Sequence, residues 1–324
     1  MRRRLGLVLA VLLVGCQAPA PRPAVAPDGD DALRRLNAAL PGDYDNHEQV
    51  LQAARGAGGG KAVAVPHLRE TWRLLSSSRD SSLWLWRLRE LDRADAPEAV
   101  WLYLVSPAAG GGGLVLTPYR PVDAAAANAA MEAPRFTFVP AQWAELAPCA
   151  QRGEWKNTQF SSAANRDACA ALVPGLGAAA ALLPLRLTLD GERLETATFT
   201  DLARGADAGV GARRVRWFDG WSAINGGGPQ ARASNQDWHM REDLRLGSEG
   251  GRVPIRWRDG APSGYSLELE RRSYAERKLS VLQLNVVEDA SGQVVDYVWA
   301  SPQATAIGLN LGWLQVGLTE TATP

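Results

Sequence analysis

Leu185-Arg186-Leu187-Thr188-Leu189-Asp190-Gly191 is the stretch that decides the fold class. Its leucines alternate with polar residues, which is the period of a strand with one buried face. The dipeptide Asp190-Gly191 is a favoured turn between antiparallel strands. A second alternating run, Leu194 to Thr200, follows the turn. The pattern therefore predicts a β-hairpin and an antiparallel architecture.

Strand patterns continue outward from this hairpin. Leu83-Trp84-Leu85-Trp86-Arg87-Leu88-Arg89 alternates between two faces, and residues 100–105 form a strand that is apolar on both faces. Helix patterns are few. A short amphipathic helix carries Leu33, Leu36 and Leu40, and an alanine-rich helix follows Asp123. We expect a mainly β fold with short N-terminal and interior helices.

Length and composition fix the number of domains and exclude some functions. A chain of 324 residues suits two domains. We place the first over residues 31–228, and a second β-rich region, to which no motif assigns a role, over 229–324. The 35 basic residues balance the 35 acidic ones without a basic cluster, which argues against nucleic-acid binding. Twelve tryptophans against five phenylalanines is unusual, because tryptophan suits a binding cavity as well as a core.

The first residues have the pattern of an export signal. Three arginines precede the apolar stretch Leu5 to Val14, which is too short to span a bilayer. It ends in Leu13-Val14-Gly15-Cys16, which is similar to a bacterial lipobox. We therefore expect residues 1–15 to be removed and Cys16 to carry lipid. Removal lowers the basic count from 35 to 32 against 35 acidic residues, a net charge of −3.

The residues after Cys16 indicate where the protein is held. Gln17, by resemblance to the lipoprotein sorting rule, favours the outer membrane over the inner one. Residues 16–30 are rich in proline and alanine and should form an extended tether. We expect a cell-envelope protein anchored by lipid to the outer membrane, with its body in the periplasm or at the surface.

The other two cysteines, Cys149 and Cys169, lie twenty positions apart. In an oxidising compartment an even pair most simply forms a disulfide. Two buried free thiols or one functional thiol are the alternatives.

One motif near the N-terminus resembles a known family. Leu36 and Leu40 begin the pattern Leu-x-x-x-Leu-x-Gly-x-Tyr-x-Asn-x-x-Gln, which is completed by Gly42, Tyr44, Asn46 and Gln49. It resembles the N-terminal signature of the CpcT/CpeT chromophore lyase family. The likeness continues through Pro66-His67-Leu68-Arg69, the tryptophan-rich strands and the paired cysteines, to about residue 225.

The resemblance implies a calyx-like antiparallel β-barrel. In cyanobacterial members this barrel holds a linear tetrapyrrole, or bilin, and transfers it to a cysteine of a phycobiliprotein. Trp84, Trp86, Trp101 and Tyr103 are the candidates for lining such a pocket, and core packing is the alternative for all four. The family's Tyr-Arg-x-Arg element is replaced by residues 100–105, and the pair Tyr119-Arg120 lies later. This departure puts bilin transfer in doubt.

Other catalytic and metal patterns are incomplete. There is no Gly-x-Ser-x-Gly, and His47-Glu48 lacks the second histidine of a zinc helix. Asp237 and His239 could supply two metal ligands, but a solvated loop is favoured, so we predict no metal site. His67 is interpreted as structural.

These observations leave three hypotheses for the function. The leading one is a lipoprotein whose barrel binds an apolar or tetrapyrrole-like small molecule without transferring it. The second is an authentic chromophore lyase. The third is a non-catalytic structural or assembly lipoprotein whose barrel is filled by its own tryptophans and whose C-terminal region contacts a protein partner.

Overall fold

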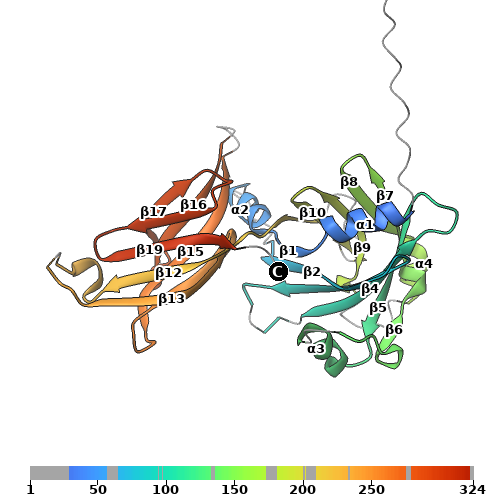
Figure 1. The fold of residues 1–324 in the computed structure, drawn as a ribbon, viewed down its shortest axis with the longest axis horizontal. Helices are drawn as coiled ribbons and strands as arrows, with labels where there is room; N and C mark the ends of the chain where they lie inside the picture. The colour runs from blue at the N-terminus through green and yellow to red at the C-terminus, as the bar shows by residue number, and fades with distance from the viewer. Residues whose placement is uncertain are drawn as a thin grey trace, which may run out of the picture.

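The computed structural model describes residues 29–56, 65–93, 95–96, 98–132, 136–172, 181–199, 201, 209–232, 234–274 and 279–321. The predicted signal, the lipidation site at Cys16 and most of the tether lie outside these ranges. Within them no helix is long and apolar enough to cross a membrane. The predicted mainly β fold is confirmed, and Figure 1 shows two β bodies side by side.

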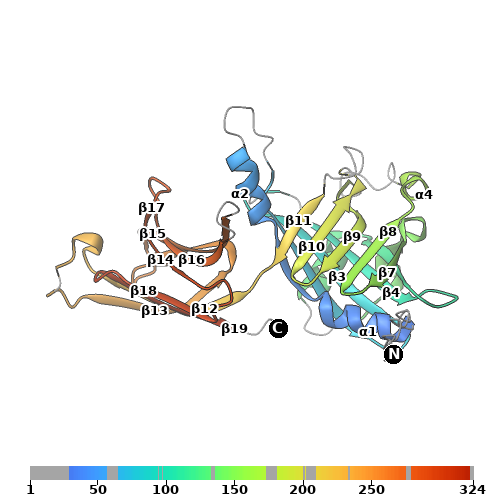
Figure 2. The same ribbon diagram turned by 90° about the horizontal axis from the view of Figure 1, so that it is seen from above.

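A closed antiparallel barrel forms the first body (Figure 2). In order around the barrel, its ten strands are β1 (Gly42–Asp45), β2 (Leu68–Ser77), β3 (Ser82–Glu90), β4 (Ala99–Pro107), β5 (Leu114–Pro121), β7 (Gln151–Lys156), β8 (Gln159–Ala164), β9 (Pro184–Asp190), β10 (Arg193–Thr198) and β11 (Val210–Arg214). β11 pairs with β1 and closes the ring. The short strand β6 (Trp143–Glu145) pairs with β5 beside the barrel. The hairpin predicted over 185–200 is formed by β9 and β10.

Two segments close the ends of the barrel. Helix α1 (Gly29–Ala39) lies across one end, where Asn37 donates a hydrogen bond to Ser82, the first residue of β3. Leu33 and Leu36 of α1 are fully buried in the barrel core, as is Leu40 just after it. The 3₁₀ turn η2 (Ala147–Cys149) and helix α4 (Arg166–Ala170) lie at the opposite end, joined by the Cys149–Cys169 disulfide. The predicted disulfide is therefore present.

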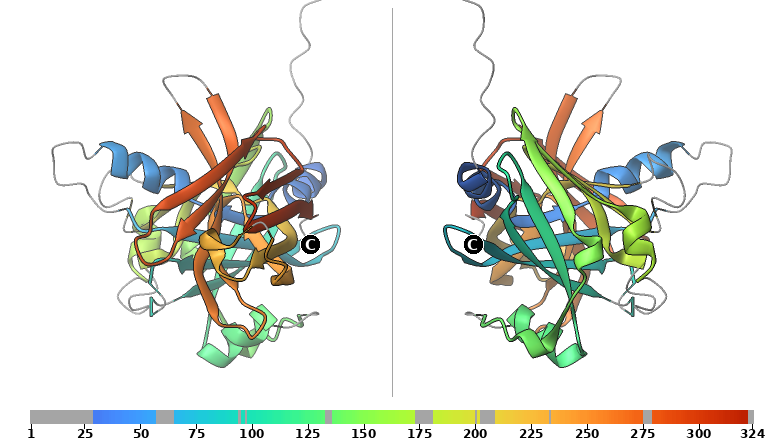
Figure 3. Two further views of the ribbon diagram at one scale, coloured as in Figure 1. Left: turned by 90° about the vertical axis from the view of Figure 1, so that its left-hand side faces the viewer. Right: turned by 90° about the vertical axis from the view of Figure 1, so that its right-hand side faces the viewer.

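Two further helices lie outside the barrel (Figure 3). Helix α3 (Ala124–Glu132) packs Ala126 and Ala130 against the outer face of β3 and β4. Helix α2 (His47–Gly56) leaves β1 and contacts the second body. The predicted tether is too long by two residues, because α1 begins at Gly29 with Asp30 and Asp31 in its first turn. Acidic side chains there are favoured by the helix dipole.

The second body is a sandwich of two four-stranded antiparallel sheets. One sheet contains β13 (Trp238–Gly247), β12 (Trp217–Asn225), β19 (Leu314–Thr321) and β18 (Ala306–Asn310), and the other contains β14 (Glu249–Arg256), β15 (Pro262–Tyr274), β16 (Leu279–Glu288) and β17 (Val294–Ala300). Leucine, isoleucine, valine and phenylalanine side chains from both sheets form its core. This body has a hydrophobic core separate from that of the barrel.

The predicted boundary at residues 228/229 is wrong. Strand β12 pairs with β13 and β19, so the chain enters the sandwich between Arg214 and Trp217. The glycines at 226–228, which suggested a linker, form part of the connection between β12 and β13. A glycine-rich turn within one sheet has the same composition as a linker between domains.

We expect the disulfide to stabilise the folded protein. Both cysteines are fully buried where they close the barrel end. Replacing both with alanine should lower the free energy of unfolding by about 3 kcal/mol in the chain-entropy model. Guanidinium unfolding monitored by tryptophan fluorescence measures this change. Unchanged stability, or two free thiols in non-reducing mass mapping, would contradict the bridge.

Candidate functional site

The four candidate pocket residues point into the barrel. Trp84 and Trp86 of β3, and Trp101 and Tyr103 of β4, belong to one core cluster with Trp72 of β2. None of these five side chains is more than 2% exposed to a water-sized probe. The ring centroids of Trp72 and Tyr103 lie 5.3 Å apart, and those of Trp72 and Trp86 6.4 Å apart. The aromatic side chains therefore pack on each other, and no water-sized space borders them.

One ionisable group lies inside this aromatic core. Glu70 of β2 is 1% exposed and accepts hydrogen bonds from Trp86 Nε1, at 2.9 Å, and from the Thr196 hydroxyl. Burial raises the pKa of the Glu70 carboxyl, although the two donors oppose the shift. Among the described residues, the indole nitrogens of Trp84 and Trp101 have no hydrogen-bond partner. The barrel interior is thus filled with side chains, and it contains the Glu70 carboxyl, whose removal from water is unfavourable.

The family-motif residues stabilise the corner from α1 to α2. Gly42 has a φ of +148°, and a Cβ there would lie 2.5 Å from Arg214 Nη1. The Tyr44 hydroxyl donates to the Leu40 carbonyl oxygen. Asn46 donates to the Pro66 carbonyl and accepts from the Leu68 amide, while Gln49 donates to the Gly209 carbonyl. These hydrogen bonds fix the backbone between α1 and α2.

The odd-numbered residues between the motif positions point the other way. Asp43 and Asp45 lie on the face of β1 opposite to Tyr44, because side chains alternate along the strand. His47 begins α2 and contacts Glu270 of the second body. Asp43 accepts hydrogen bonds from the Thr71 hydroxyl and from Trp217 Nε1, both within 2.9 Å. The motif corner therefore carries these three side chains to the junction of the two bodies.

A cleft of about 700 Å³ opens at this junction. The barrel contributes His47, His67 and Arg69 to its lining, and the sandwich contributes Trp217, Arg245 and Arg252. A smaller hollow of about 180 Å³ shares Arg69 and Trp217 with the cleft and adds Arg87 and Arg89. Asp92 and Glu268 also line the cleft, so basic and acidic side chains are gathered around one half-buried tryptophan.

Trp217 lies between cations from the two bodies. The guanidinium carbon of Arg69 is 5.3 Å from its ring centroid, and that of Arg245 is 5.0 Å away. Both distances are within the range of a cation–π interaction. Arg69 belongs to β2 and Arg245 to β13, so this arrangement exists only when barrel and sandwich are docked.

Asp45 organises the barrel side of the cleft. Its fully buried carboxylate accepts from His67 Nε2 at 2.7 Å, from Arg69 Nη2 at 2.8 Å and from the His47 amide at 2.9 Å. Burial alone would lower the pKa of His67, but the hydrogen bond to Asp45 and the negative charge of Asp45 outweigh it, so the pKa is raised. The Asp45 carboxylate therefore favours the protonated form of the His67 imidazole beside the arginines of the cleft.

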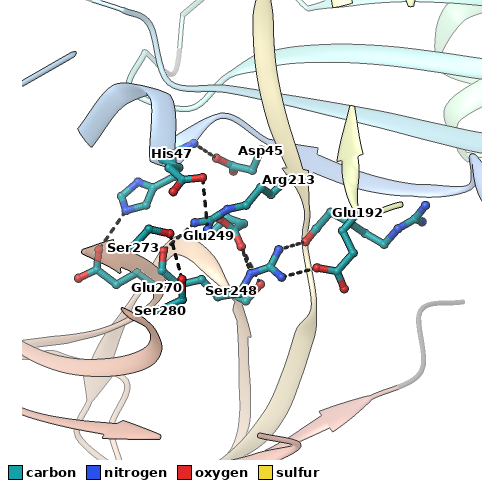
Figure 4. A network of polar contacts seen from close by, with 12 residues as sticks. Asp45, His47, Glu192, Arg213, Ser248, Glu249, Glu270, Ser273 and Ser280 are labelled. Carbon is teal, nitrogen blue, oxygen red and sulfur yellow. Dashed lines mark hydrogen bonds and ion pairs between the residues drawn. The ribbon is translucent and has the colours of Figure 1, made fainter. Parts of the chain in front are cut away.

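Buried ion pairs fix the two bodies together (Figure 4). Glu249 of β14, at 0% exposure, accepts from Arg213 of β11 at 2.9 Å and from Arg271 of β15. Arg271 also pairs with Glu192 of the β9–β10 turn at 2.7 Å. His47 Nε2 lies 3.2 Å from Glu270 Oε2. Each of these contacts, except that between Glu249 and Arg271, links the barrel to the sandwich.

Comparison with known proteins assigns neither a family nor a function to this chain. No protein-family model matches this chain, and no curated protein matches it. Over the described ranges, no three His, Cys, Asp or Glu side chains are grouped so that they could hold a metal ion. Asp237 and His239 form an ion pair at 3.3 Å at the edge of the sandwich.

Sequence reasoning selected the motif residues and missed their neighbours. Asp45, Arg69, Trp217 and Arg245 were not candidates, and His67 was interpreted as structural. Period-two alternation through residues 42–45 is the signal that could have shown Asp43 and Asp45 on a common face, whereas His47 begins a helix. No sequence pattern connects them with Arg245, which is about 200 residues further along the chain.

Glu70 yields a prediction about the filled barrel. Because its pKa is raised, unfolding releases a proton, and stability falls as pH rises above the unfolded value of about 4.3. In Glu70→Gln the amide oxygen can accept from Trp86 while the amide nitrogen donates to Thr196. The variant should therefore be more stable at pH 7 by on the order of 1 kcal/mol, with a smaller advantage at pH 4.5. Denaturant unfolding at both pH values measures this.

The matched control is Glu154→Gln on β7, where the carboxyl is exposed and should show no such pH-dependent gain. A Glu70→Gln variant that is less stable than the wild type at both pH values would contradict a destabilising buried carboxyl.

His67 gives a prediction for the cleft. Its raised folded pKa means that protonation stabilises the protein below about pH 6.5, and this stabilisation is lost as pH rises through the folded value. NMR titration of the His67 ring should show a midpoint above 6.5. Asp45→Asn should lower that midpoint more than Asp92→Asn, since Asp92 is exposed and lies 3.7 Å from Nδ1. Equal effects of the two substitutions would remove Asp45 as the main cause.

Proposed function

We propose that this protein is a lipid-anchored lipoprotein of the bacterial outer membrane, with a CpcT/CpeT-like barrel, that binds a small amphipathic anion. The binding site we assign is the cleft between barrel and sandwich. The expected ligand has a flat apolar body and carboxylate groups. A linear tetrapyrrole with its two propionates belongs to this class.

One observation carries the proposal. Arg69 and Arg245 flank Trp217 in an open cleft, where the Asp45 carboxylate raises the pKa of His67. The half-buried Trp217 ring offers apolar surface to a flat ligand, and the guanidinium groups beside it can pair with carboxylates. The barrel interior supports binding less well, because its tryptophans are packed against each other.

The chemistry of the cleft favours binding over group transfer. Arginine guanidinium groups stay protonated and act as hydrogen-bond donors, so they bind and orient an anion. Among the described residues, neither His47 nor His67 is hydrogen-bonded to a serine, threonine or cysteine that it could activate. We therefore infer that the protein binds its ligand without transferring it, and that the ligand lies in the cleft and not inside the barrel.

Titration of the full chain with biliverdin tests this proposal. Binding should change the bilin absorbance and quench tryptophan fluorescence. Arg245→Gln should weaken binding about tenfold, equivalent to about 1.4 kcal/mol, because it removes a guanidinium group that can exchange its exposed ion pair with Asp219 for a ligand carboxylate. Biliverdin dimethyl ester, which lacks the two charges, should bind more weakly than the acid. Raising the pH through the folded pKa of His67 should also weaken binding.

Arg256→Gln is the matched control, because Arg256 is an exposed arginine of β14 that does not line the cleft. If Arg245→Gln and esterification leave the affinity unchanged while Trp101→Phe lowers it, the ligand binds in the barrel and the cleft assignment is wrong. No spectral change with either compound would contradict the ligand class.

A further inference from the structure

Strand β17 lies at the edge of its sheet (Figure 1). Within the described part of the chain it pairs with β16 on one side only. An edge strand presents unpaired backbone N–H and C=O groups to another strand, and proteins usually protect such edges with lysine, proline or a short length. The seven residues Val294-Val295-Asp296-Tyr297-Val298-Trp299-Ala300 contain neither lysine nor proline, and Asp296 is their single charge.

Large apolar side chains are concentrated on this edge. Val294, Val295, Tyr297 and Trp299 are 47–63% exposed, and Leu279 on β16 is 46% exposed. These are five of the eight exposed large hydrophobic side chains among the described residues. Such a concentration indicates an interaction surface, whereas scattered single residues would not.

The edge adjoins a groove on the outer face of the sheet. The groove has a volume of about 500 Å³ and is lined by Arg272, Tyr274, Leu279, Gln283, Tyr297 and Trp299. Helix α2 meets the same sheet at β15, through the His47–Glu270 pair and a hydrogen bond from Arg55 to the Ser273 carbonyl. The groove therefore continues a face that already forms an interface with the barrel.

We propose that a second copy of this chain covers the edge, with the two β17 strands paired antiparallel about a two-fold axis. A register centred on Tyr297 aligns all seven residues, since Val294 then lies opposite Ala300 and Val295 opposite Trp299. Asp296 lies opposite Val298, so the carboxylates of the two copies do not oppose each other. A register centred on Asp296 would place like charges together, which is unfavourable.

This pairing joins two four-stranded sheets into one of eight strands. The interface is isologous, since the same strand is used by both copies. It pairs the open backbone groups and brings Tyr297 next to its own symmetry mate and Trp299 against a β-branched residue, which are favourable cross-strand pairs. The proposal is independent of the ligand assigned to the cleft.

Sedimentation equilibrium of the full chain in mild detergent tests the association. The wild type should be dimeric. Tyr297→Lys and Trp299→Lys should raise the dimer dissociation constant at least tenfold, because the side chains are exposed and the new charges lie at the two-fold axis or beside it. Met240→Lys is the matched control, since Met240 is 53% exposed on β13 in the other sheet.

Disulfide trapping tests the register. Tyr297→Cys should give a covalent dimer under oxidising conditions, because residue 297 faces itself across the axis. Val294→Cys, also exposed on β17, should give none. A monomer at 100 µM, as an order-of-magnitude ceiling for weak association, would overturn the proposal. A dimer whose dissociation constant is unchanged by Tyr297→Lys would also overturn it. The same holds for a monomer whose tryptophan fluorescence responds to added saccharides, because the groove would then be a glycan-binding site.

Discussion

The contact on which the rest of the structure depends is a buried carboxylate between two guanidinium groups. Glu249 is completely buried and receives Arg213 from the barrel and Arg271 from its own sandwich. Removing charges from water is expensive, so such a triad is weak evidence for stability. The triad does constrain how the two bodies are placed, because the buried negative charge of Glu249 would not be fully compensated if one guanidinium group moved away. Charge pairing therefore helps to set the relative position of the two bodies.

The cleft follows from that fixed position. Arg69 and Arg245 come from different bodies and both lie against Trp217, and the ion pairs of Glu249 and Arg271 help to hold those bodies in register. His47 contributes to the same junction, where Gly250 lies against it with a φ of +76°. A Cβ at position 250 would lie 2.4 Å from the His47 ring, so only glycine allows this close approach. Binding groups and structural contacts thus share the same few residues.

Sequence alone predicted the secondary structure better than the site. Alternation revealed the β9–β10 hairpin and the inward face of Trp84 and Trp86, because it reports which side chains share a face. It does not report whether the facing side chains meet, so filled and open barrels have the same pattern. The domain boundary was misplaced because the glycines at 226–228 have the composition of a linker. The cleft could not be predicted, since it joins residues 69 and 245 through tertiary docking.

The two ends of the barrel are closed in different ways, and this difference has a mechanical consequence. One end is held by the Cys149–Cys169 covalent bond, and the other by the apolar packing of Leu33, Leu36 and Leu40. Helix α1 is also the first described element of the chain. A force applied to the chain upstream of Gly29 is therefore borne first by the non-covalent contacts of α1, and the covalently closed end carries load only after α1 has been pulled away from the barrel.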